Sequence, residues 1–400
     1  MIDSKQMPVP STKHRVAIIH PWLFEVRGGE KVFFELARLI PEADLFLLFG
    51  HTDKMPLELR QRLVGTSFLQ GLRFWRYSYR STLPLLPFAV GRLDMRKYDL
   101  VISSSSGWTH GIKTREDAVH VCYMYTPPRY LWEPDVHLPT RFSRFLGPIL
   151  KLPLAFLRNW DRKAAKRVSE FIGISELVRE RIRNVYGAES LVISPPADVD
   201  RFAGIRRNPG SSVLVIGELV PYKRFDLAIE ACAIARRHLV IIGDGPEMQR
   251  LRSLARPNDV TFLGRVGNEE VDYQLSVAGV YLHPGIEDFG LATVEALAAG
   301  VPVVGVSTGG TAEIVGQNRV GYLADGVGAK SIANAINACF QCLPSEDACR
   351  KRATDFTAGV FTAKITAAIS NRADFVHFSP DVSQAERPPE AAPTKSAVER

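Results

Sequence analysis

The sequence predicts an α/β protein with two domains. Its 400 residues exceed what a single hydrophobic core usually holds, so we expect the chain to divide. Short apolar segments alternate with helix-forming segments, a pattern typical of open sheets covered by helices. In the clearest unit, the apolar strand 280–282 precedes a loop, an Ala-rich helix that ends at Gly300, and a second strand at 301–306.

The first predicted domain covers residues 14–205. It begins with a strand at 16–20, and a loop then leads to Gly28 and Gly29, where an amphipathic helix opens. A helix start leaves N–H groups free for a phosphate, so this is a candidate phosphate-binding turn, although two such glycines alone are more often a simple turn. We expect further strands at 44–49, 98–102, 118–123 and 171–175, and helical structure at 56–98 and 176–186.

His110 follows the predicted strand 98–102 at the end of a Ser-rich segment. Ligands of open α/β sheets collect at the carboxyl ends of the strands. His110 is therefore a candidate catalytic or donor-contacting residue, with a purely structural histidine as the alternative.

The second predicted domain covers residues 210–345 and follows a linker that ends in Asn-Pro-Gly at 208–210. Besides the two strands named above, we expect strands at 212–217, 238–243 and 260–263, and helices at 332–339 and 347–368. Residues 346–372 are expected to cross back onto the first domain. The segment 373–400 is rich in Pro, Ala and Glu, which predicts a disordered tail.

Two acids mark the loop and helix of the 280–306 unit. Glu287 lies in the loop, and Glu295 lies near the start of the helix that opens after Gly290. This arrangement suits a nucleotide diphosphate-sugar, because the helix start favours a diphosphate while carboxylates accept hydrogen bonds from sugar and ribose hydroxyls. The alternative is a plain strand–helix–strand unit with one capping acid and one solvated acid.

Lys223 and Arg224 follow the predicted strand 212–217, beside a helix start. Two cations at the end of a strand could stabilise a departing diphosphate through charge-assisted hydrogen bonds. The alternative is a solvated basic face.

The segment EDFGLATVE at 287–295 resembles the E-x7-E element of the retaining glycosyltransferases of family 4, which have the GT-B fold. The resemblance covers about residues 14–370 and implies two Rossmann-like domains that face a cleft. It implies that Glu287 contacts the donor sugar, that Glu295 contacts the ribose, and that no metal is essential. The residues that it places near the diphosphate or the nucleobase are Gly28, Gly29, Gly264, Arg265, Gly290 and Leu291.

The sequence departs from the family pattern at two positions. Tyr125 stands where a histidine is common, and a tyrosine with a pKa near 10 cannot act as a base at neutral pH. Glu218 stands where an arginine that binds phosphate is expected, and its carboxylate would repel a diphosphate. Both departures leave a non-catalytic relative that binds nucleotide-sugar as an alternative; a nucleotide-sugar epimerase is a second one.

Charge and composition limit the partners. The net charge is +7, and two basic runs, 60–97 and 141–183, lie in the first half of the chain. They indicate an anionic partner such as a membrane, and without a nucleic-acid-binding motif we exclude nucleic acid. The apolar segments 83–88 and 144–157 could contact a bilayer, but they could equally be buried, and two prolines argue against one continuous helix at 144–157.

We therefore predict a glycosyltransferase that moves a sugar, with mannose from GDP-mannose as the first choice, onto a lipid-linked saccharide in cell-surface polysaccharide or lipopolysaccharide assembly. No predicted transmembrane segment, secretory signal or disulfide framework accompanies it, so we expect a cytoplasmic protein in peripheral contact with the membrane. Cys339, Cys342 and Cys349 lack a fourth nearby ligand, which favours packing over a zinc site. Apart from the donor we expect no cofactor.

Overall fold

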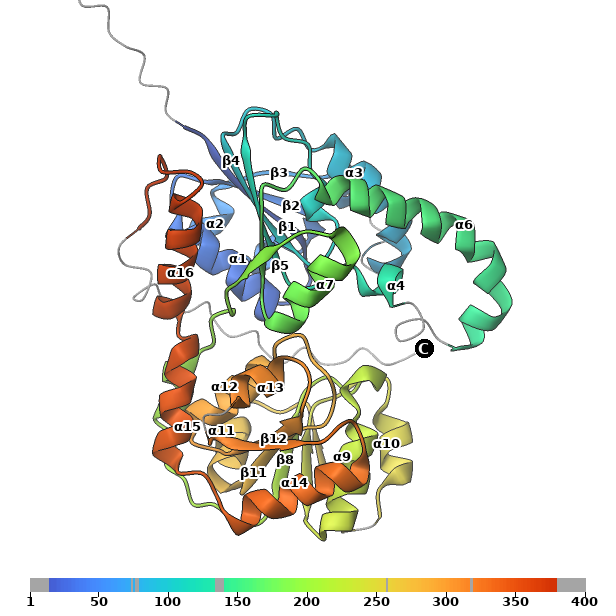
Figure 1. The fold of residues 1–400 in the computed structure, drawn as a ribbon, viewed down its shortest axis with the longest axis vertical. Coiled ribbons are helices and arrows are strands. Elements are labelled where there is room, and N and C mark those ends of the chain that lie inside the picture. Colours follow the sequence, from blue (N-terminus) through green and yellow to red (C-terminus); the bar gives the residue numbers. More distant parts are fainter. Residues whose placement is uncertain are drawn as a thin grey trace, which may run out of the picture.

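The chain folds into two parallel sheets, each covered by helices, one above the other in Figure 1. The structure is a computed structural model and describes residues 14–72, 75, 79–133, 140–256, 258–316 and 319–379. The described strands pair in parallel throughout. This confirms the predicted α/β class.

The sheet of the first half has the strand order β3-β2-β1-β4-β5-β6-β7. Its strands are β1 (Val16–Leu23), β2 (Asp44–Gly50), β3 (Leu63–Thr66), β4 (Leu100–Ser105), β5 (Val119–Met124), β6 (Glu170–Gly173) and β7 (Ser190–Val192). The α-helices of this half are α1 (Gly28–Leu39), α2 (Leu57–Arg60), α3 (Leu86–Arg92), α4 (Arg129–Trp132), α6 (Thr140–Ala165), α7 (Glu176–Tyr186) and α8 (Val199–Ala203). Shorter 3-10 turns η1 (Thr52–Lys54), η2 (Phe68–Gly71), η4 (Tyr79–Leu85) and η5 (Thr109–Gly111) join them.

The sheet of the second half has the order β10-β9-β8-β11-β12-β13. Its strands are β8 (Val213–Ile216), β9 (Leu239–Ile242), β10 (Val260–Gly264), β11 (Val280–His283), β12 (Val303–Val306) and β13 (Gly321–Ala324). The helices are α9 (Phe225–Ala235), α10 (Met248–Leu254), α11 (Asn268–Val277), α12 (Leu291–Ala298), α13 (Gly310–Val315) and α14 (Ala329–Gln341), with the 3-10 turn η6 (Pro221–Lys223) before α9. The residues of β11 and β12 are buried throughout, as expected for central strands covered on both faces.

Both sheets change winding direction at one pair of neighbouring strands. In the first sheet this switch point lies between β1 and β4, and in the second it lies between β8 and β11. Open parallel sheets bind ligands outside the carboxyl ends of the strands at such a point. The topology therefore singles out the loops that follow β1, β4, β8 and β11.

Three of the described strands were absent from the sequence prediction. β3 lies in the stretch 56–98 that was expected to be helical, and no element was predicted at β7 or β13. All three are edge strands of three or four residues, and such short segments carry little periodicity of their own. They adopt the strand conformation because a neighbouring strand supplies the hydrogen bonds.

The prediction for the stretch around 144–157 was also wrong in one respect, because α6 runs through both prolines as one helix of 26 residues. In its second part, Leu154, Leu157 and Trp160 pack against the apolar cluster on the outer face of the first sheet. Tertiary packing thus outweighs the break that the prolines predict.

The last helices return from the second half to the first (Figure 1). The predicted helix 347–368 is divided into α15 (Glu346–Ala353), the 3-10 turn η7 (Thr354–Phe356) and α16 (Ala358–Ser370). Phe361 of α16 packs edge-on against Tyr123 of β5, and Arg372 pairs with Glu170 of β6 at 2.5 Å. Residues 373–379 of the predicted tail also pack here, since Phe375 stacks on His14 at 4.0 Å; residues 380–400 lie outside the described part.

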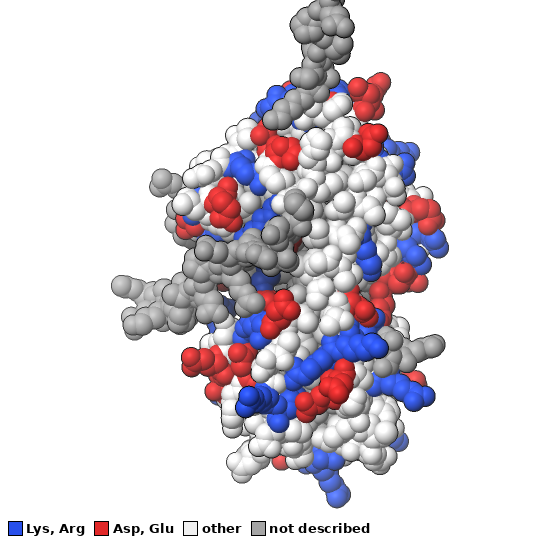
Figure 2. Space-filling model, turned by 90° about the vertical axis from the view of Figure 1, so that its left-hand side faces the viewer, with Lys and Arg blue, Asp and Glu red and all other residues white. Residues whose placement is uncertain are grey.

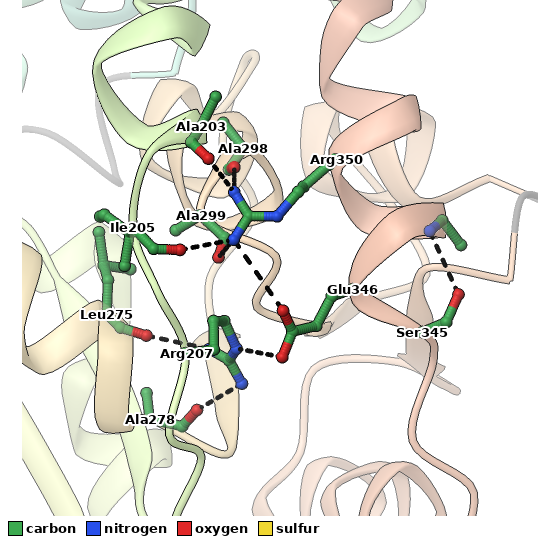
Figure 3. Close-up of polar contacts among 11 residues, drawn as sticks. Ala203, Ile205, Arg207, Leu275, Ala278, Ala298, Ala299, Ser345, Glu346 and Arg350 are labelled. Atoms are coloured by element: carbon green, nitrogen blue, oxygen red, sulfur yellow. Dashed lines mark hydrogen bonds and ion pairs between the residues drawn. The ribbon is translucent and has the colours of Figure 1, made fainter.

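One guanidinium fixes α15 to the chain between the two sheets (Figure 3). Arg350 donates hydrogen bonds of 2.7–3.0 Å to four carbonyls: Ala203 at the end of α8, Ile205 two residues beyond it, and Ala298 and Ala299 at the end of α12. Arg207 donates in the same way to Leu275 and Ala278, and Glu346 lies between the two arginines at 3.6 and 4.0 Å. The stretch 203–207 is therefore held against the helices of the second half.

Candidate functional site

Glu287 contacts two basic side chains of the second half, Lys223 and His283. The loop after β11 packs closely on η6, where a Cβ on Gly285 would lie 2.8 Å from the carbonyl oxygen of Tyr222. This contact brings the Glu287 Oε1 atom to 3.5 Å from the Lys223 Nζ atom. The other carboxylate oxygen lies 3.0 Å from Nε2 of His283, the buried last residue of β11.

These neighbours decide the charge of Glu287. Burial by itself would raise the pKa of its carboxyl group, but the hydrogen bond from His283 and the charges of His283, Lys223 and Arg129 outweigh burial and lower the pKa to about 2. Glu287 is therefore a carboxylate at neutral pH. It can accept hydrogen bonds from a sugar but cannot donate one.

Two helix starts meet where the halves face each other. Gly290 begins α12 with φ +100°, a left-handed backbone that favours glycine. A Cβ on Gly28, at the start of α1, would lie 2.6 Å from Cδ1 of Leu291, so the two halves approach closely at this glycine. We call Gly28, Gly29, Lys223, His283, Glu287, Gly290 and Leu291 the interface site.

Glu295 lies one turn into α12, next to this site. Burial raises the pKa of its carboxyl group, and the charges of Lys31 in α1 and Arg201 in α8 partly oppose the rise. The second predicted acid is thus half-buried and faces cations of the first half. Its position on the helix that begins at Gly290 agrees with the expected place for a ribose contact, and that contact stays a prediction.

Tyr125 supports the glycine turn of the first half. Its hydroxyl donates to the carbonyl of Gly29 at 2.8 Å and lies 2.8 Å from Oγ of Ser104. Ser104 in turn contacts Nδ1 of His20 at 2.9 Å, and His20 stacks on Phe33. Burial raises the pKa of Tyr125 far above its ordinary value, so the phenol remains protonated and acts as a hydrogen-bond donor.

Asp288, which the sequence reading passed over, links the two halves. It is buried and forms ion pairs with Arg129 of α4 and Arg181 of α7. Arg129 also lies over the ring of Tyr222, 5.4 Å from its centroid. The described contacts of Arg129 are therefore with Asp288 and Tyr222. His283 was missed too, although its spacing of four residues from Glu287 at a strand end was a usable signal.

Arg224, Arg265 and Gly264 lie near the site but not within the Glu287 cluster. Arg224 adopts a left-handed backbone (φ +56°) and pairs with Asp226 at 3.1 Å. Gly264 ends β10 with φ +70°, and Arg265 lies 3.9 Å from Glu25 of the first half. Their roles toward diphosphate and nucleobase stay predictions.

His110 lies inside the first half. Its side chain is 0% exposed, and its Nε2 atom lies 3.1 Å from Oδ1 of Asp161 in α6. The rings of Trp160 and Tyr186 lie beside it. Because the described part of the structure encloses the ring completely, His110 is not brought to the interface site, and its geometry is that of a residue that holds α6 in place.

The described residues contain no group of three or more His, Cys, Asp or Glu side chains that could hold a metal ion, and metal independence of the reaction stays a prediction. Cys339 and Cys349 are buried and Cys342 is exposed. A cavity of about 440 Å³ lies away from the interface site, at the starts of β6 and β7. Glu287 and Lys223 lie instead after β11 and β8, the two strands at the switch point of the second sheet.

Comparisons with known proteins match nearly the whole chain in two parts. Residues 26–201 match the family "Glycosyltransferase Family 4", and residues 198–356 match "Glycosyl transferases group 1". The chain is 33% identical over 193 residues to a GDP-mannose-dependent alpha-(1-6)-phosphatidylinositol monomannoside mannosyltransferase of Mycobacterium tuberculosis, which covers 41% of this chain and 50% of the relative. It is 30% identical over 196 residues to a phosphatidyl-myo-inositol mannosyltransferase of Mycobacterium leprae (45% and 51%). The chain thus matches about half the length of these curated relatives.

Solved structures share the fold at low sequence identity. The Anabaena protein HepE in complex with UDP superposes with a TM-score of 0.61 at 17% identity, over 89% of this chain and all of that one. The two-sheet architecture described above is therefore shared with HepE.

Proposed function

We infer that this chain, which belongs to the GT-B glycosyltransferases of family 4 type, transfers a sugar from a nucleotide-sugar donor to an acceptor. The observation that carries this proposal is the Glu287 cluster. An ionised carboxylate, Lys223 and two helix starts lie together outside the switch points of both sheets. Carboxylate oxygens suit the hydroxyls of a sugar, and cations with helix starts suit a diphosphate.

In this proposal the chain's own residues divide the work. Glu287 orients the donor sugar, while Lys223 and the N–H groups at the starts of α1 and α12 stabilise the negative charge that develops on the leaving diphosphate. Asp288, through Arg129 and Arg181, keeps the two halves at the distance that this arrangement needs. Retention of the anomeric configuration is the outcome that the family type favours.

We propose GDP-mannose as the donor, because relatives that match this chain are named GDP-mannose-dependent mannosyltransferases. Among GDP, UDP and ADP at equal concentration, we expect GDP to raise the midpoint of thermal unfolding most, since the ligand with the lowest Kd stabilises the folded state most. Incubation with labelled GDP-mannose, UDP-sugars and a membrane extract then identifies the product. Labelled lipid supports transfer. A sugar isomer formed without acceptor, or binding without any product, would contradict it.

We further propose that the acceptor is a lipid-linked saccharide used in cell-surface polysaccharide assembly, reached by peripheral contact with the cytoplasmic face of an anionic membrane. None of the described helices is both long and apolar enough to span a bilayer. On α6, however, Leu152 is 82% and Phe156 62% exposed, and Arg162 and Lys163 follow in the last turn. An apolar helix face beside basic residues suits the surface of an anionic bilayer.

The opposite side of the molecule carries charges of both signs. Figure 2 shows the face that carries α15 and α16, where basic and acidic side chains are interspersed. A contact through α6 would leave that face in water.

Replacing both exposed apolar residues, Leu152→Glu with Phe156→Glu, should abolish most binding to anionic liposomes at low salt, because two carboxylates would enter the headgroup region. Cosedimentation measures the bound fraction. Ile234→Glu, at an exposed apolar position of α9, is the matched control and should bind as the wild type does. A wild-type protein that stays in the supernatant, or a double variant that still binds, would refute the membrane contact.

A further inference from the structure

Arg27 reaches from the first half to the second next to the interface site. It is the residue before Gly28, whose Cα lies against Leu291 of α12. Its guanidinium donates to Oε2 of Glu218, in the loop between β8 and η6, at 2.8 Å. The same group donates to Glu25 through Nε and Nη2, at 3.0 and 2.8 Å. The guanidinium thus occupies the space between the loop that precedes α1 and the loop that precedes α9.

Exposure separates Arg27 from the other arginines that cross between the halves. The side chains of Arg129 and Arg181 are 17% and 20% exposed and are held by the buried Asp288, whereas Arg27 is 56% exposed. Exposed ion pairs contribute little to stability, so Glu25 and Glu218 orient Arg27 without holding it tightly. A more highly charged anion can therefore compete for it.

The chemistry of the guanidinium matches a diphosphate. Arginine binds phosphate oxygens through two parallel N–H bonds, a geometry that lysine does not offer. Lys223 is already shared with Glu287, and Arg224 is paired with Asp226 within its own half. The carboxylate of Glu218 would repel a diphosphate if it stood alone, but it is paired with Arg27, and Arg265 lies 3.9 Å from Glu25, so the two acids face two guanidinium groups.

We propose that Arg27 is a further ligand of the donor diphosphate, contributed by the first half, and that Glu25 and Glu218 position its guanidinium. This inference rests on the proposed function, because it assigns Arg27 of the first half to the diphosphate of the proposed donor. The inference also gives Glu218 a role, since its carboxylate accepts a hydrogen bond from Arg27 of the opposite half.

Titration calorimetry of the full-length chain with GDP, UDP and ADP, in the absence of acceptor, tests the proposal. For the nucleotide that the wild type binds most tightly, Arg27→Ala should weaken binding about ten-fold or more, as expected for the loss of a charge-assisted hydrogen bond. Glu218→Ala removes a carboxylate that repels the diphosphate and leaves the guanidinium oriented by Glu25, so it should bind as tightly as the wild type or more tightly. Arg183→Ala, which breaks the exposed pair between Arg183 of α7 and Glu189, is the control and should change nothing.

The double variant Arg27→Ala with Glu218→Arg separates a ligand from a mere tie between the halves. It returns a guanidinium to the same space from the other side, so nucleotide binding should recover. Binding should still recover when Glu25→Ala is added, because that change removes the first-half acid with which the new guanidinium could pair. An unchanged affinity of Arg27→Ala for nucleotide overturns the proposal, whether or not the KM for the acceptor rises. Equal losses in Arg27→Ala and Glu218→Ala without recovery in the double variant overturn it in favour of a tie. A wild type that binds none of the three nucleotides refutes this inference and the proposed function together.

Discussion

Replacing Glu287 or Lys223 by alanine is expected to remove most turnover. The two side chains lie 3.5 Å apart and carry opposite charges at neutral pH, since the pKa of Glu287 is lowered to about 2. Loss of a group that stabilises developing charge slows a reaction by about 10²–10³-fold, and we expect a fall in kcat of this size for Lys223→Ala. Steady-state kinetics with the donor that the labelled incubation identifies measures this fall in kcat.

A conservative variant distinguishes charge from shape at this position. Glu287→Gln keeps the size of the side chain but removes the charge that faces Lys223 and His283, so it should lose nearly as much activity as Glu287→Ala. Glu189→Ala removes an acid of comparable size from an exposed pair with Arg183 and should retain wild-type rates. Near-wild-type kcat in both Glu287→Ala and Lys223→Ala would remove the assignment of the site.

The sequence predicts the second half well because its signals are local. The unit from β11 to β12 combines a buried apolar strand, a left-handed glycine and a helix of good formers, and each of these is visible within about ten residues. The edge strand β13 was missed, because its four residues carry little periodicity of their own. The placement of Glu287 after a central strand was nevertheless within reach of sequence reasoning.

Contacts between distant residues lay beyond it. Asp288 pairs with residues 159 and 107 positions away in the chain, Arg129 and Arg181, and nothing local distinguishes it from a solvated acid. Glu218 looked like a defect for the same reason, because its partner Arg27 lies 191 residues away. His110 is the opposite case. Its place at a strand end suggested chemistry, with a structural histidine as the alternative, and its buried contact with Asp161, 51 residues on, favours the structural alternative.

Arg350→Ala is expected to cause the largest loss of stability among the contacts described here. Four carbonyls lose a charged donor at once, two at the end of α12 and two at or just beyond the end of α8. Acceptors left without a partner cost about 1–3 kcal/mol each when buried, and partial access of water reduces this, so we expect a fall of about 3 kcal/mol in the free energy of unfolding. Denaturant unfolding without nucleotide measures it, because a bound ligand would mask part of the loss.

A neighbour on the same helix supplies the control. Arg352 donates to two carbonyls, Ile314 and Glu313, and pairs with Asp355, so Arg352→Ala should cost about half as much. Arg350→Lys should recover part of the loss, since an ammonium offers three donors but lacks the planar fork that spans both chain segments. If Arg350→Ala destabilises no more than Arg352→Ala, the four bonds do not hold the segment, and α12 with Gly290 at its start must be fixed by its apolar packing alone.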